Sequence, residues 1–315
     1  MISVVVPLHN EEAAAPRLLD QLCSTLSVIT KDFEIIFIDD GSTDKTLSSL
    51  LAVSEKYPQL KIVEFARRHG QTAALAAGID VARGEVIITM DGDLQHDPRE
   101  IPRFLSKLEE GFDIVSGWRK GRNDNFFFRR IPSGIANGIM RYVSGTSIKD
   151  FGSTYKAYRA QTVKKIELFG ELHRFIPILA AKNGAKIVEI PITVAARVHG
   201  SSKYNLTRTF GVFEDIFFLQ FFVNYLTKPI RAFGRLFFIF FGSGFAISSV
   251  LMVLWLLGSI HAVWEHSALL LFSVFLMTVG FQFLVVGLLA EILTRIYHHT
   301  SDTKIYNIKT IHTNT

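Results

Sequence analysis

The sequence of 315 residues has little cysteine and, between residues 236 and 290, almost no charge. Its single cysteine, Cys23, cannot form an internal disulfide, and one thiol cannot build a cysteine-based zinc site without several histidines beside it. A disulfide-stapled scaffold and a zinc finger are therefore excluded. Neither Gly-x-x-x-x-Gly-Lys-Ser/Thr nor Gly-x-Gly-x-x-Gly follows an expected strand, which argues against a P-loop protein and a dinucleotide-binding protein.

The composition is apolar for a soluble protein. Hydrophobic residues make up 49% of the chain and charged residues 20%, and 27 residues are Phe. This balance excludes a disordered chain and indicates that part of the protein lies in lipid. The net charge of +5 would indicate nucleic-acid binding only if the basic residues clustered on a soluble face. Because many of them flank the apolar runs instead, we expect no nucleic-acid partner.

Two long apolar runs lie between Arg235 and Glu291, separated by a short link that carries Glu265. The runs are Leu236 to Leu257 and Ser267 to Ala290, and each has about 22 residues or more, enough to cross about 30 Å of hydrocarbon. Buried core helices are usually shorter and carry a polar stripe. The sequence therefore predicts a hairpin of two transmembrane helices.

Such a hairpin leaves both of its ends on the same side of the membrane. Basic residues flank it there, namely Lys228, Arg231, Arg235, Arg295, Lys304 and Lys309. The positive-inside rule makes that side cytoplasmic. The sequence opens on Ile2-Ser3-Val4 without the features of a signal peptide, so we expect the soluble part to stay in the cytoplasm, held at the inner membrane with membrane lipid as a partner.

Composition divides the chain into four expected parts: a cytoplasmic α/β domain (1–205), a juxtamembrane amphipathic helix (206–233), the hairpin (234–290) and a cytoplasmic tail (291–315). In the second part, aromatic residues repeat at helical spacing, which predicts an interfacial helix, with an ordinary core helix as the alternative. The segment Phe126 to Arg130 is either an anchor at the lipid headgroups or a loop packed on its own domain. No role is assigned to residues 300–315.

Short β-branched or aromatic runs alternate with helical patterns in the first 120 residues. The expected strands are 2–7, 33–39, 61–65, 85–90 and 113–117, and the expected helices are 12–29, 44–57, 71–83 and 98–110. This alternation predicts βαβ units and a mostly parallel sheet. Ligands of such sheets bind outside the carboxyl ends of the strands, so the loops there are candidates for a functional site.

Three polar loops are expected at that edge. Strand one leads into Pro7 to Glu11, strand two into Asp39 to Asp44, and strand four into Asp91-Gly92-Asp93-Leu94-Gln95. The first two could be ordinary turns that cap the next helix. The third offers carboxylate and amide oxygens, which suit Mg²⁺ or Mn²⁺ if an anionic substrate such as a diphosphate completes the coordination.

Four ordered motifs resemble the family 2 glycosyltransferases: Val5 to Glu12, Ile38 to Asp44, Ala77 to Gly84 and Met90 to Pro98. Three more segments resemble the polyprenyl-phosphate glycosyltransferases, relatives of dolichyl-phosphate mannose synthase: Lys149 to Arg159, Gly170 to Pro177 and Arg197 to Tyr204. The two C-terminal spans are similar to the bacterial glucosyl-type branch. The resemblance covers essentially the whole chain.

The resemblance implies a Rossmann-like GT-A fold, followed by the interfacial helix and the two spans. It also implies inverting transfer of a sugar from a nucleotide sugar, such as UDP-glucose, to polyprenyl (undecaprenyl) phosphate, for modification of cell-envelope glycans. It assigns nucleotide binding to Pro7, Asn10, Glu11 and Asp39. It assigns Mg²⁺ or Mn²⁺ and the diphosphate to Asp91, Asp93 and Gln95, and catalysis to Asp91, Asp93 and Asp150.

The implied acceptor is a phosphate monoester, whose second pKa of about 6 leaves it mostly ionised at neutral pH. It needs cations that let it approach another anion more than it needs a base. Arginine is suited to this because its fork grips phosphate oxygens in pairs. The candidates are Arg119, Arg174, Arg197 and Lys203. Asp150 is then expected to orient the acceptor or a cation such as Arg174 or Lys203, with an ordinary turn residue as the alternative.

Two other classes of protein are alternatives to this interpretation. A processive membrane polysaccharide synthase would carry a Gln-x-x-Arg-Trp motif and more spans, and the sequence has neither. A non-catalytic membrane-anchored binder of nucleotide sugars would not need both Asp91 and Asp93 together with the phosphate-side cations. Gly242, Ser243 and Gly244 would let copies of the hairpin approach one another, so a homo-oligomer is compatible with the sequence.

The predicted orientation can be tested by cysteine labelling in a Cys23→Ser background. A cysteine introduced at Ser259, in the link between the spans, should react with a membrane-impermeant thiol reagent in intact cells. A cysteine at Ser54 should react only after the membrane is opened. Labelling of the second site and not the first in intact cells would reverse the orientation.

Overall fold

The structure is a computed structural model that describes residues 1–119, 148–166, 168, 172–193, 230–258, 266–300 and 304–313. The chain forms two compact units. The first comprises Met1–Ile216 and Lys304–Thr315, and the second comprises Phe217–Thr303.

The first unit contains a sheet of eight described strands in the order β7-β5-β6-β4-β1-β2-β3-β8. The strands are β1 (Ile2–Leu8), β2 (Phe33–Asp39), β3 (Leu60–Phe65), β4 (Val86–Thr89), β5 (Ile114–Arg119), β6 (Lys156–Arg159), β7 (Ile187–Ile192) and β8 (Ile308–Thr313). The pairs β1–β2, β1–β4, β2–β3 and β5–β7 are parallel. Strand β6 runs antiparallel between β4 and β5, and β8 runs antiparallel to β3. The predicted mostly parallel sheet is confirmed.

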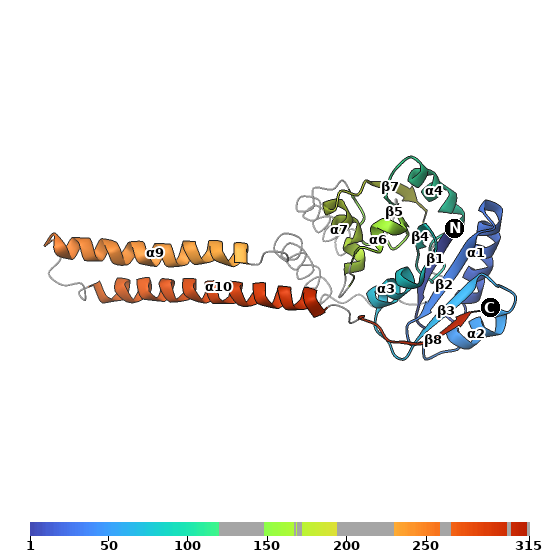
Figure 1. Cartoon of the computed structure of the whole chain (residues 1–315), viewed down its shortest axis with the longest axis horizontal. Helices are drawn as coiled ribbons and strands as arrows, with labels where there is room; N and C mark the ends of the chain where they lie inside the picture. The colour runs from blue at the N-terminus through green and yellow to red at the C-terminus, as the bar shows by residue number, and fades with distance from the viewer. Residues whose placement is uncertain are drawn as a thin grey trace. The chain divides into compact units, whose positions relative to one another are not determined.

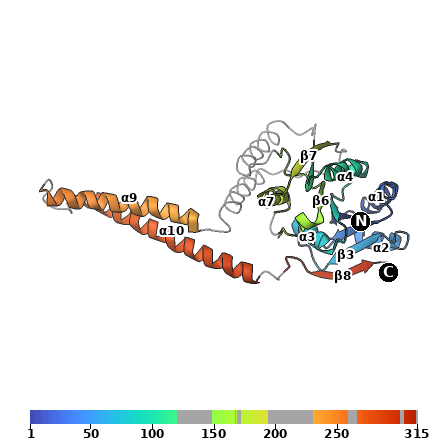
Figure 2. The same cartoon turned by 45° about the horizontal axis from the view of Figure 1, so that its top comes forward.

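Helices cover both faces of this sheet (Figures 1 and 2). They are α1 (Ala15–Ile29), α2 (Thr46–Ser54), α3 (Gln71–Val81), α4 (Ile101–Glu109), α6 (Ala160–Val163) and α7 (Ile176–Lys182), with short 3₁₀ helices at Pro98–Glu100 and Leu172–Phe175. Helices α1, α4 and α7 each carry a proline in the first turn, where its fixed φ suits the helix and its missing N–H costs no hydrogen bond.

The core follows from the alternation of side chains along the strands. On one face, Val4 and Val6 of β1 pack in the same cluster as Leu18 and Leu22 of α1. On the other face, Val5 lies against Gly78 of α3, where an added Cβ would be 2.3 Å from Val5 Cγ1. Strands β1 and β2 are therefore buried on both faces, as is usual for parallel strands covered by helices.

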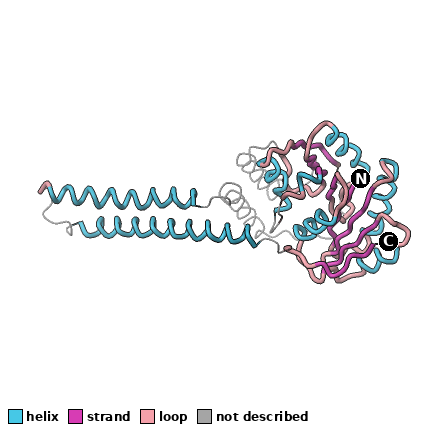
Figure 3. Tube along the Cα trace, in the orientation of Figure 1, coloured by secondary structure: helices cyan, strands magenta, loops and turns pink. Residues whose placement is uncertain are grey.

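The expected strands of the first 119 residues are confirmed, with ends that differ by no more than two residues. The sequence analysis did not predict β6, β7 or β8. Strand β8 lies in the segment to which no role was assigned, and it pairs with β3 from Lys61 opposite Thr313 to Phe65 opposite Ile308. Figure 3 marks both chain ends on this unit, with the C-terminal strand at the edge of the sheet.

The second unit is an antiparallel pair of helices, α9 (Ile230–Leu256) and α10 (Ser267–Thr300). Both are long and apolar enough to cross a membrane, over Phe233–Leu256 and Ser267–Leu293, and only 11% of each of these windows is buried inside the structure. A soluble core helix would be mostly buried, so the prediction of two long apolar helices that could span a membrane is confirmed. The predicted juxtamembrane helix lies mostly outside the described residues, which resume at Ile230.

Small residues let α9 and α10 pack closely within one chain. An added Cβ at Gly244 would lie 2.5 Å from the Ser273 carbonyl oxygen, and one at Gly280 would lie 2.6 Å from the Phe241 nitrogen. The hydroxyls of Ser248 and Ser273 are 2.8 Å apart. Gly244, which the sequence analysis offered for contacts between copies, therefore serves packing inside the hairpin, whereas Gly242 meets nothing within 4 Å.

These contacts predict different effects for two matched substitutions. Gly280→Leu should destabilise the hairpin by about 1–3 kcal/mol, because the new side chain must push the two helix backbones apart. Gly242→Leu, which meets open space within the chain, should have little effect. Thermal unfolding of the detergent-solubilised protein measures both, and equal unfolding temperatures for the two variants would contradict the packing described.

Candidate active site

The loops after β1 and β2 are tied together by hydrogen bonds. The Asn10 N–H donates to Ser42 Oγ at 3.0 Å, and the Thr43 N–H donates to Asn10 Oδ1 at 2.8 Å. Asn10 has a φ of +59°, a conformation that Asn tolerates better than most residues. The Glu11 N–H donates to Thr46 Oγ1 at 2.8 Å. Asn10 therefore links the loop after β1 to the loop after β2 and stabilises both.

Asp39 is the last residue of β2 and Asp40 follows it, and the two carboxylates have different hydrogen-bond partners. Asp40 accepts hydrogen bonds from the N–H groups of His69 at 2.6 Å and Gly70 at 2.9 Å, so its side chain is used in holding the chain after β3. Asp39 is 2% exposed and accepts from the Ser42 N–H at 3.4 Å. Burial raises the pKa of Asp39 above its ordinary value, and the nearby Glu64 charge raises it further, against the hydrogen bonds of Ser42.

The third loop follows β4 and lies against the end of β1. An added Cβ at Gly92 would be 2.3 Å from Leu8 Cδ2 and 3.3 Å from the Pro7 carbonyl oxygen. Asp91 Oδ1 accepts from the Gln71 side-chain amide at 2.8 Å, and Asp91 Oδ2 lies 3.6 Å from His96 Nε2. The structure thus places all three predicted loops at the carboxyl ends of adjacent parallel strands.

Within this loop, the Gln95 N–H donates to Asp93 Oδ1 at 3.1 Å. Burial alone would raise the pKa of Asp91, but its interactions with His96, Thr154 and Arg119 together outweigh it, so the pKa of Asp91 is lowered and the group is ionised at neutral pH. Neither the side-chain amide of Gln71 nor the imidazole of His96 was picked out from the sequence, because each contacts Asp91 only after folding.

The donor atoms of this loop fit a divalent cation. Asp91, Asp93 and Gln95 supply carboxylate and amide oxygens, which are the ligands that Mg²⁺ and Mn²⁺ prefer. In the part of the chain that the structure describes, no group of three or more His, Cys, Asp or Glu side chains could hold a metal ion by itself. Two carboxylates and one amide leave positions open in the octahedral coordination that Mg²⁺ prefers, so the set fits a cation whose coordination is completed by the diphosphate of a bound nucleotide.

A partly buried ion pair lies at the end of β5. Arg119 Nε donates to Asp150 Oδ2 at 2.7 Å and Arg119 Nη2 donates to Asp150 Oδ1 at 2.8 Å, with side chains 19% and 14% exposed. Gly152 permits this approach, since an added Cβ would lie 3.0 Å from Arg119 Nη2. Burial would raise the pKa of Asp150, but the Arg119 guanidinium outweighs it and lowers that pKa. The sequence analysis suggested Arg174 or Lys203 as the cation oriented by Asp150, whereas the structure pairs it with Arg119.

The backbone beside this pair is held by Glu189 of β7. Its carboxylate accepts from the N–H groups of Lys149 at 2.8 Å and Asp150 at 3.0 Å. Burial raises the pKa of Glu189, and the negative charge of Asp150 adds to the shift against these two hydrogen bonds. Glu189 was not identified from the sequence, because only strand pairing of β5 with β7 brings it to Asp150.

Two buried basic residues lie near the same carboxylates. Lys156 of β6 pairs with Thr89 of β4 on one side and Ser116 of β5 on the other, and its ammonium donates to the Ser153 carbonyl. Burial lowers the pKa of Lys156 to about 8. His173 is hydrogen-bonded to Thr72 Oγ1 at 2.7 Å, and burial together with the Arg174 charge lowers its pKa to about 3. His173 is therefore uncharged at neutral pH and adds no positive charge for an acceptor phosphate.

Of the remaining predicted acceptor residues, only Arg174 lies among the residues that the structure describes. Arg174 is half-buried in the 3₁₀ helix Leu172–Phe175. Arg197 and Lys203, with the aromatic-basic segment Phe126 to Arg130, lie outside the described residues. The assignment of Arg174, Arg197 and Lys203 to the acceptor stays a prediction.

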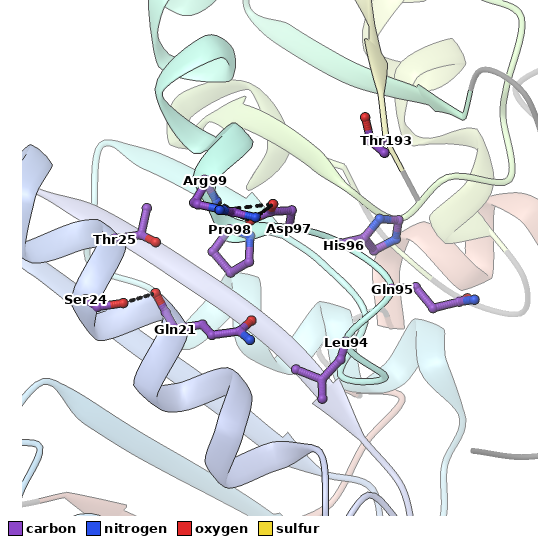
Figure 4. Close-up of a pocket in the computed structure, with 10 residues that line it drawn as sticks. All are labelled: Gln21, Ser24, Thr25, Leu94, Gln95, His96, Asp97, Pro98, Arg99 and Thr193. Carbon is purple, nitrogen blue, oxygen red and sulfur yellow. Dashed lines mark hydrogen bonds and ion pairs between the residues drawn. The ribbon is translucent and has the colours of Figure 1, made fainter. Parts of the chain in front are cut away.

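A pocket of about 540 Å³ adjoins the loop after β4 (Figure 4). Figure 4 shows Gln21, Ser24 and Thr25 along α1 on one side, and His96 and Thr193 on the other. Gln95 belongs both to this pocket and to the candidate metal ligands, so the pocket lies directly beside the loop after β4.

The chain belongs to glycosyl transferase family 2, whose family model matches residues 3–167. The family assignment made from the motifs is thereby confirmed. The match covers all three loops described above and the Arg119–Asp150 pair.

Two relatives match nearly the whole chain. The dodecaprenyl-phosphate galacturonate synthase of Rhizobium johnstonii is 38% identical over 318 residues, which cover 98% of this chain and 92% of the relative. The undecaprenyl-phosphate 4-deoxy-4-formamido-L-arabinose transferase of Photorhabdus laumondii is 35% identical over 300 residues, which cover 94% of this chain and 90% of the relative. The chain is thus similar to polyprenyl-phosphate sugar transferases, as the sequence analysis predicted.

The fold resembles that of a solved glycosyltransferase. The glucosyl-3-phosphoglycerate synthase of Mycobacterium tuberculosis, in complex with Mn²⁺, UDP-glucose and phosphoglyceric acid, superposes with a TM-score of 0.55 at 19% identity, over 71% of this chain and 79% of that one. A complex of the same enzyme with Mn²⁺, UDP and phosphoglyceric acid has a TM-score of 0.56 at 18% identity, over 71% and 78% of the two chains. The predicted GT-A fold is confirmed.

The Arg119–Asp150 pair predicts how the Asp150→Asn variant responds to pH. Because the pKa of Asp150 is held below its ordinary value, its carboxylate stays ionised from about pH 6 to about pH 9 and does not titrate in that window. Replacing it with Asn leaves Arg119 without one acceptor oxygen, so sugar transfer should fall by a nearly constant factor, about tenfold or more, across the range.

The measurement is the initial rate of sugar transfer as a function of pH. Asp32→Asn is the matched control, because Asp32 is 70% exposed and precedes β2 at the end opposite the site. A loss for Asp150→Asn that shrinks steeply as the pH rises would instead assign Asp150 as a general base.

Proposed function

We propose that the protein transfers one sugar from a nucleotide sugar to a polyprenyl phosphate at the cytoplasmic face of the inner membrane. The observation that carries the proposal is the arrangement at the carboxyl ends of the strands. Carboxylates that fit a cation–diphosphate complex lie near a paired arginine, whose charge is close enough to help lower the pKa of Asp91. The two relatives, each named for a polyprenyl-phosphate product or acceptor, support the same acceptor here.

On the donor side, the loops after β1 and β2 would bind the nucleoside, with Pro7, Asn10, Glu11 and Asp39 as the contact residues. Asp39 is suited to this role, because its neighbour Asp40 is already occupied by two backbone N–H groups. Asp91, Asp93 and Gln95 would hold the cation and diphosphate. A bound Mg²⁺ or Mn²⁺ would neutralise the charge that the leaving nucleoside diphosphate gains as the glycosidic bond breaks.

On the acceptor side, the phosphate would approach the anomeric carbon from the face opposite the leaving diphosphate. A bond forms between a phosphate oxygen and that carbon while the bond from carbon to diphosphate oxygen breaks, which inverts the configuration. The phosphate is mostly ionised above about pH 6, so no proton has to be removed. Arg119 would stabilise its charge, and Asp150 and Glu189 would hold Arg119 in place.

The hairpin is compatible with this location. Residues 1–216 and 304–315 belong to one compact unit, so a chain that crosses the membrane twice between them returns to the side from which it left. Catalysis then takes place on the side that carries the basic flanks, which the positive-inside rule makes cytoplasmic. The lipid acceptor would be available at that surface.

The sugar is tested with a panel of donors. Purified full-length protein, Mg²⁺ and undecaprenyl phosphate are incubated separately with UDP-glucose, UDP-galacturonate and UDP-4-deoxy-4-formamido-L-arabinose, and the lipid product is analysed by mass. We expect addition of a single sugar with one preferred donor, and UDP-glucose is the donor predicted from the sequence. A polymer would favour a processive synthase, and nucleotide binding without any lipid product would favour a non-catalytic binder.

The cation gives a separate prediction. Excess chelator should abolish transfer and Mg²⁺ or Mn²⁺ should restore it, because the diphosphate otherwise leaves with uncompensated charge. Asp93→Asn should lower the rate about a hundredfold or more while the far-UV circular dichroism and the unfolding temperature stay close to those of the native protein. Full turnover in excess chelator would overturn the assignment of this loop.

A further inference from the structure

The C-terminal strand β8 brings two basic side chains to one carboxylate of β3. Lys309 Nζ donates to Glu64 Oε1 at 2.6 Å, and His312 Nε2 lies 3.1 Å from Glu64 Oε2. Both oxygens of Glu64 are therefore engaged by the tail, and the carboxylate is 12% exposed. These contacts join a residue that precedes the hairpin in the sequence to two residues that follow it.

Glu64 stands next to the nucleotide-side carboxylate. In the parallel register of β2 and β3, Asp39 pairs with Glu64, so the two side chains point to the same face of the sheet. Two unscreened carboxylates at this spacing repel one another, and the negative charge of Glu64 raises the pKa of Asp39. Lys309 counteracts this repulsion. Its ammonium hydrogen-bonds to Glu64 and lowers the pKa of that carboxylate, and its positive charge offsets the negative charge of Glu64.

The tail also contacts the structure that holds the neighbouring loop. Tyr306 stacks on Phe65 with ring centroids 5.7 Å apart, and its hydroxyl donates to Asp80 Oδ2 at 2.6 Å. Phe65 in turn packs edge-on against His69, whose N–H donates to Asp40. The beginning of β8 is thus fixed at the carboxyl end of β3, next to the carboxyl end of β2 where Asp39 and Asp40 lie.

We propose that β8 is a positioning element for donor binding: the Lys309 ammonium and the hydrogen bond of His312 offset the charge of Glu64, so that Glu64 repels neither the Asp39 carboxylate nor an anionic nucleotide bound beside it. This inference rests on the proposed function, which assigns Asp39 to the nucleotide. Glu64, Lys309 and His312 then act on the donor through Asp39 and through the charge of Glu64, without contact with the donor itself.

The test uses full-length protein and UDP with Mg²⁺ as the probe, measured by isothermal titration calorimetry. The double variant Lys309→Gln/His312→Gln leaves Glu64 charged and unpaired, and its Kd for UDP should rise about tenfold. Adding Glu64→Gln to that variant should restore the Kd to within about twofold of the native value, because the repelling charge is gone. Kinetically, the donor KM should rise in the double variant, while kcat and the acceptor KM stay unchanged.

Two variants separate charge from packing. Glu64→Gln alone removes both ion pairs to the tail but also the repulsion, so it should bind UDP at least as tightly as the native protein. Lys107→Gln breaks an exposed Lys–Glu pair on α4, whose N–O distance is 2.7 Å, and is the matched control that should leave the Kd unchanged.

Weakened binding by Glu64→Gln alone, or a triple variant as weak as the double, would show that the tail acts by strand packing and would overturn the proposal. A double variant that binds UDP like the native protein would also overturn it, with the proposed function intact. If the native protein binds neither UDP nor GDP, ADP or CDP, the proposed function fails and this inference fails with it.

Discussion

The parallel pairing of β1 with β2 on one side and β4 on the other is the constraint from which the site follows. Parallel strands end at the same edge, so the loops after β1, β2 and β4 meet there whatever their sequences. Two glycines allow the close contacts with β1 on which this arrangement depends. Gly78 lets α3 lie on β1, and Gly92 lets the acidic loop lie against Leu8. A side chain at either position would collide with the core.

A second theme is that most carboxylates at this edge are held by partners from distant segments. Asp40 is bound by backbone N–H groups after β3, Asp91 by Gln71 of α3, Asp150 by Arg119 of β5, and Glu64 by the C-terminal strand. Removing one partner of such a pair leaves a poorly solvated charge, which costs more than the pair itself contributes. The negative charge needed to bind a cation is therefore kept in place by the fold around it.

Much of the first half of the fold was predictable, because short β-branched strands such as 33–39 alternate with amphipathic helices such as 15–29, and both patterns are local. Strand β8 was not predictable in this way. It is a six-residue edge strand with mixed polar and apolar residues, and its partner β3 lies more than two hundred residues earlier in the chain. Strand β6 was missed because it has only four residues, and β7 was missed because it pairs with β5, which lies about seventy residues earlier in the chain.

The same limit applies to the site. Motifs located Asp39, Asp91, Asp93 and Asp150, since each follows a strand or a recognisable segment. They did not identify Arg119 as the partner of Asp150, because that pairing depends on where β5 ends in space. Side chains that act through another residue, such as Gln71 and Glu189, have no sequence signal of their own.

The central claim is that the loop after β4 and a bound nucleoside diphosphate together form the cation site. Electron paramagnetic resonance of Mn²⁺ tests it directly, with Mn²⁺–UDP in buffer as the reference. The account predicts a protein-bound Mn²⁺ spectrum only when protein and UDP are both present, and its loss in Asp93→Asn. Equally tight Mn²⁺ binding without UDP, or a ternary complex unaffected by Asp93→Asn, would contradict it.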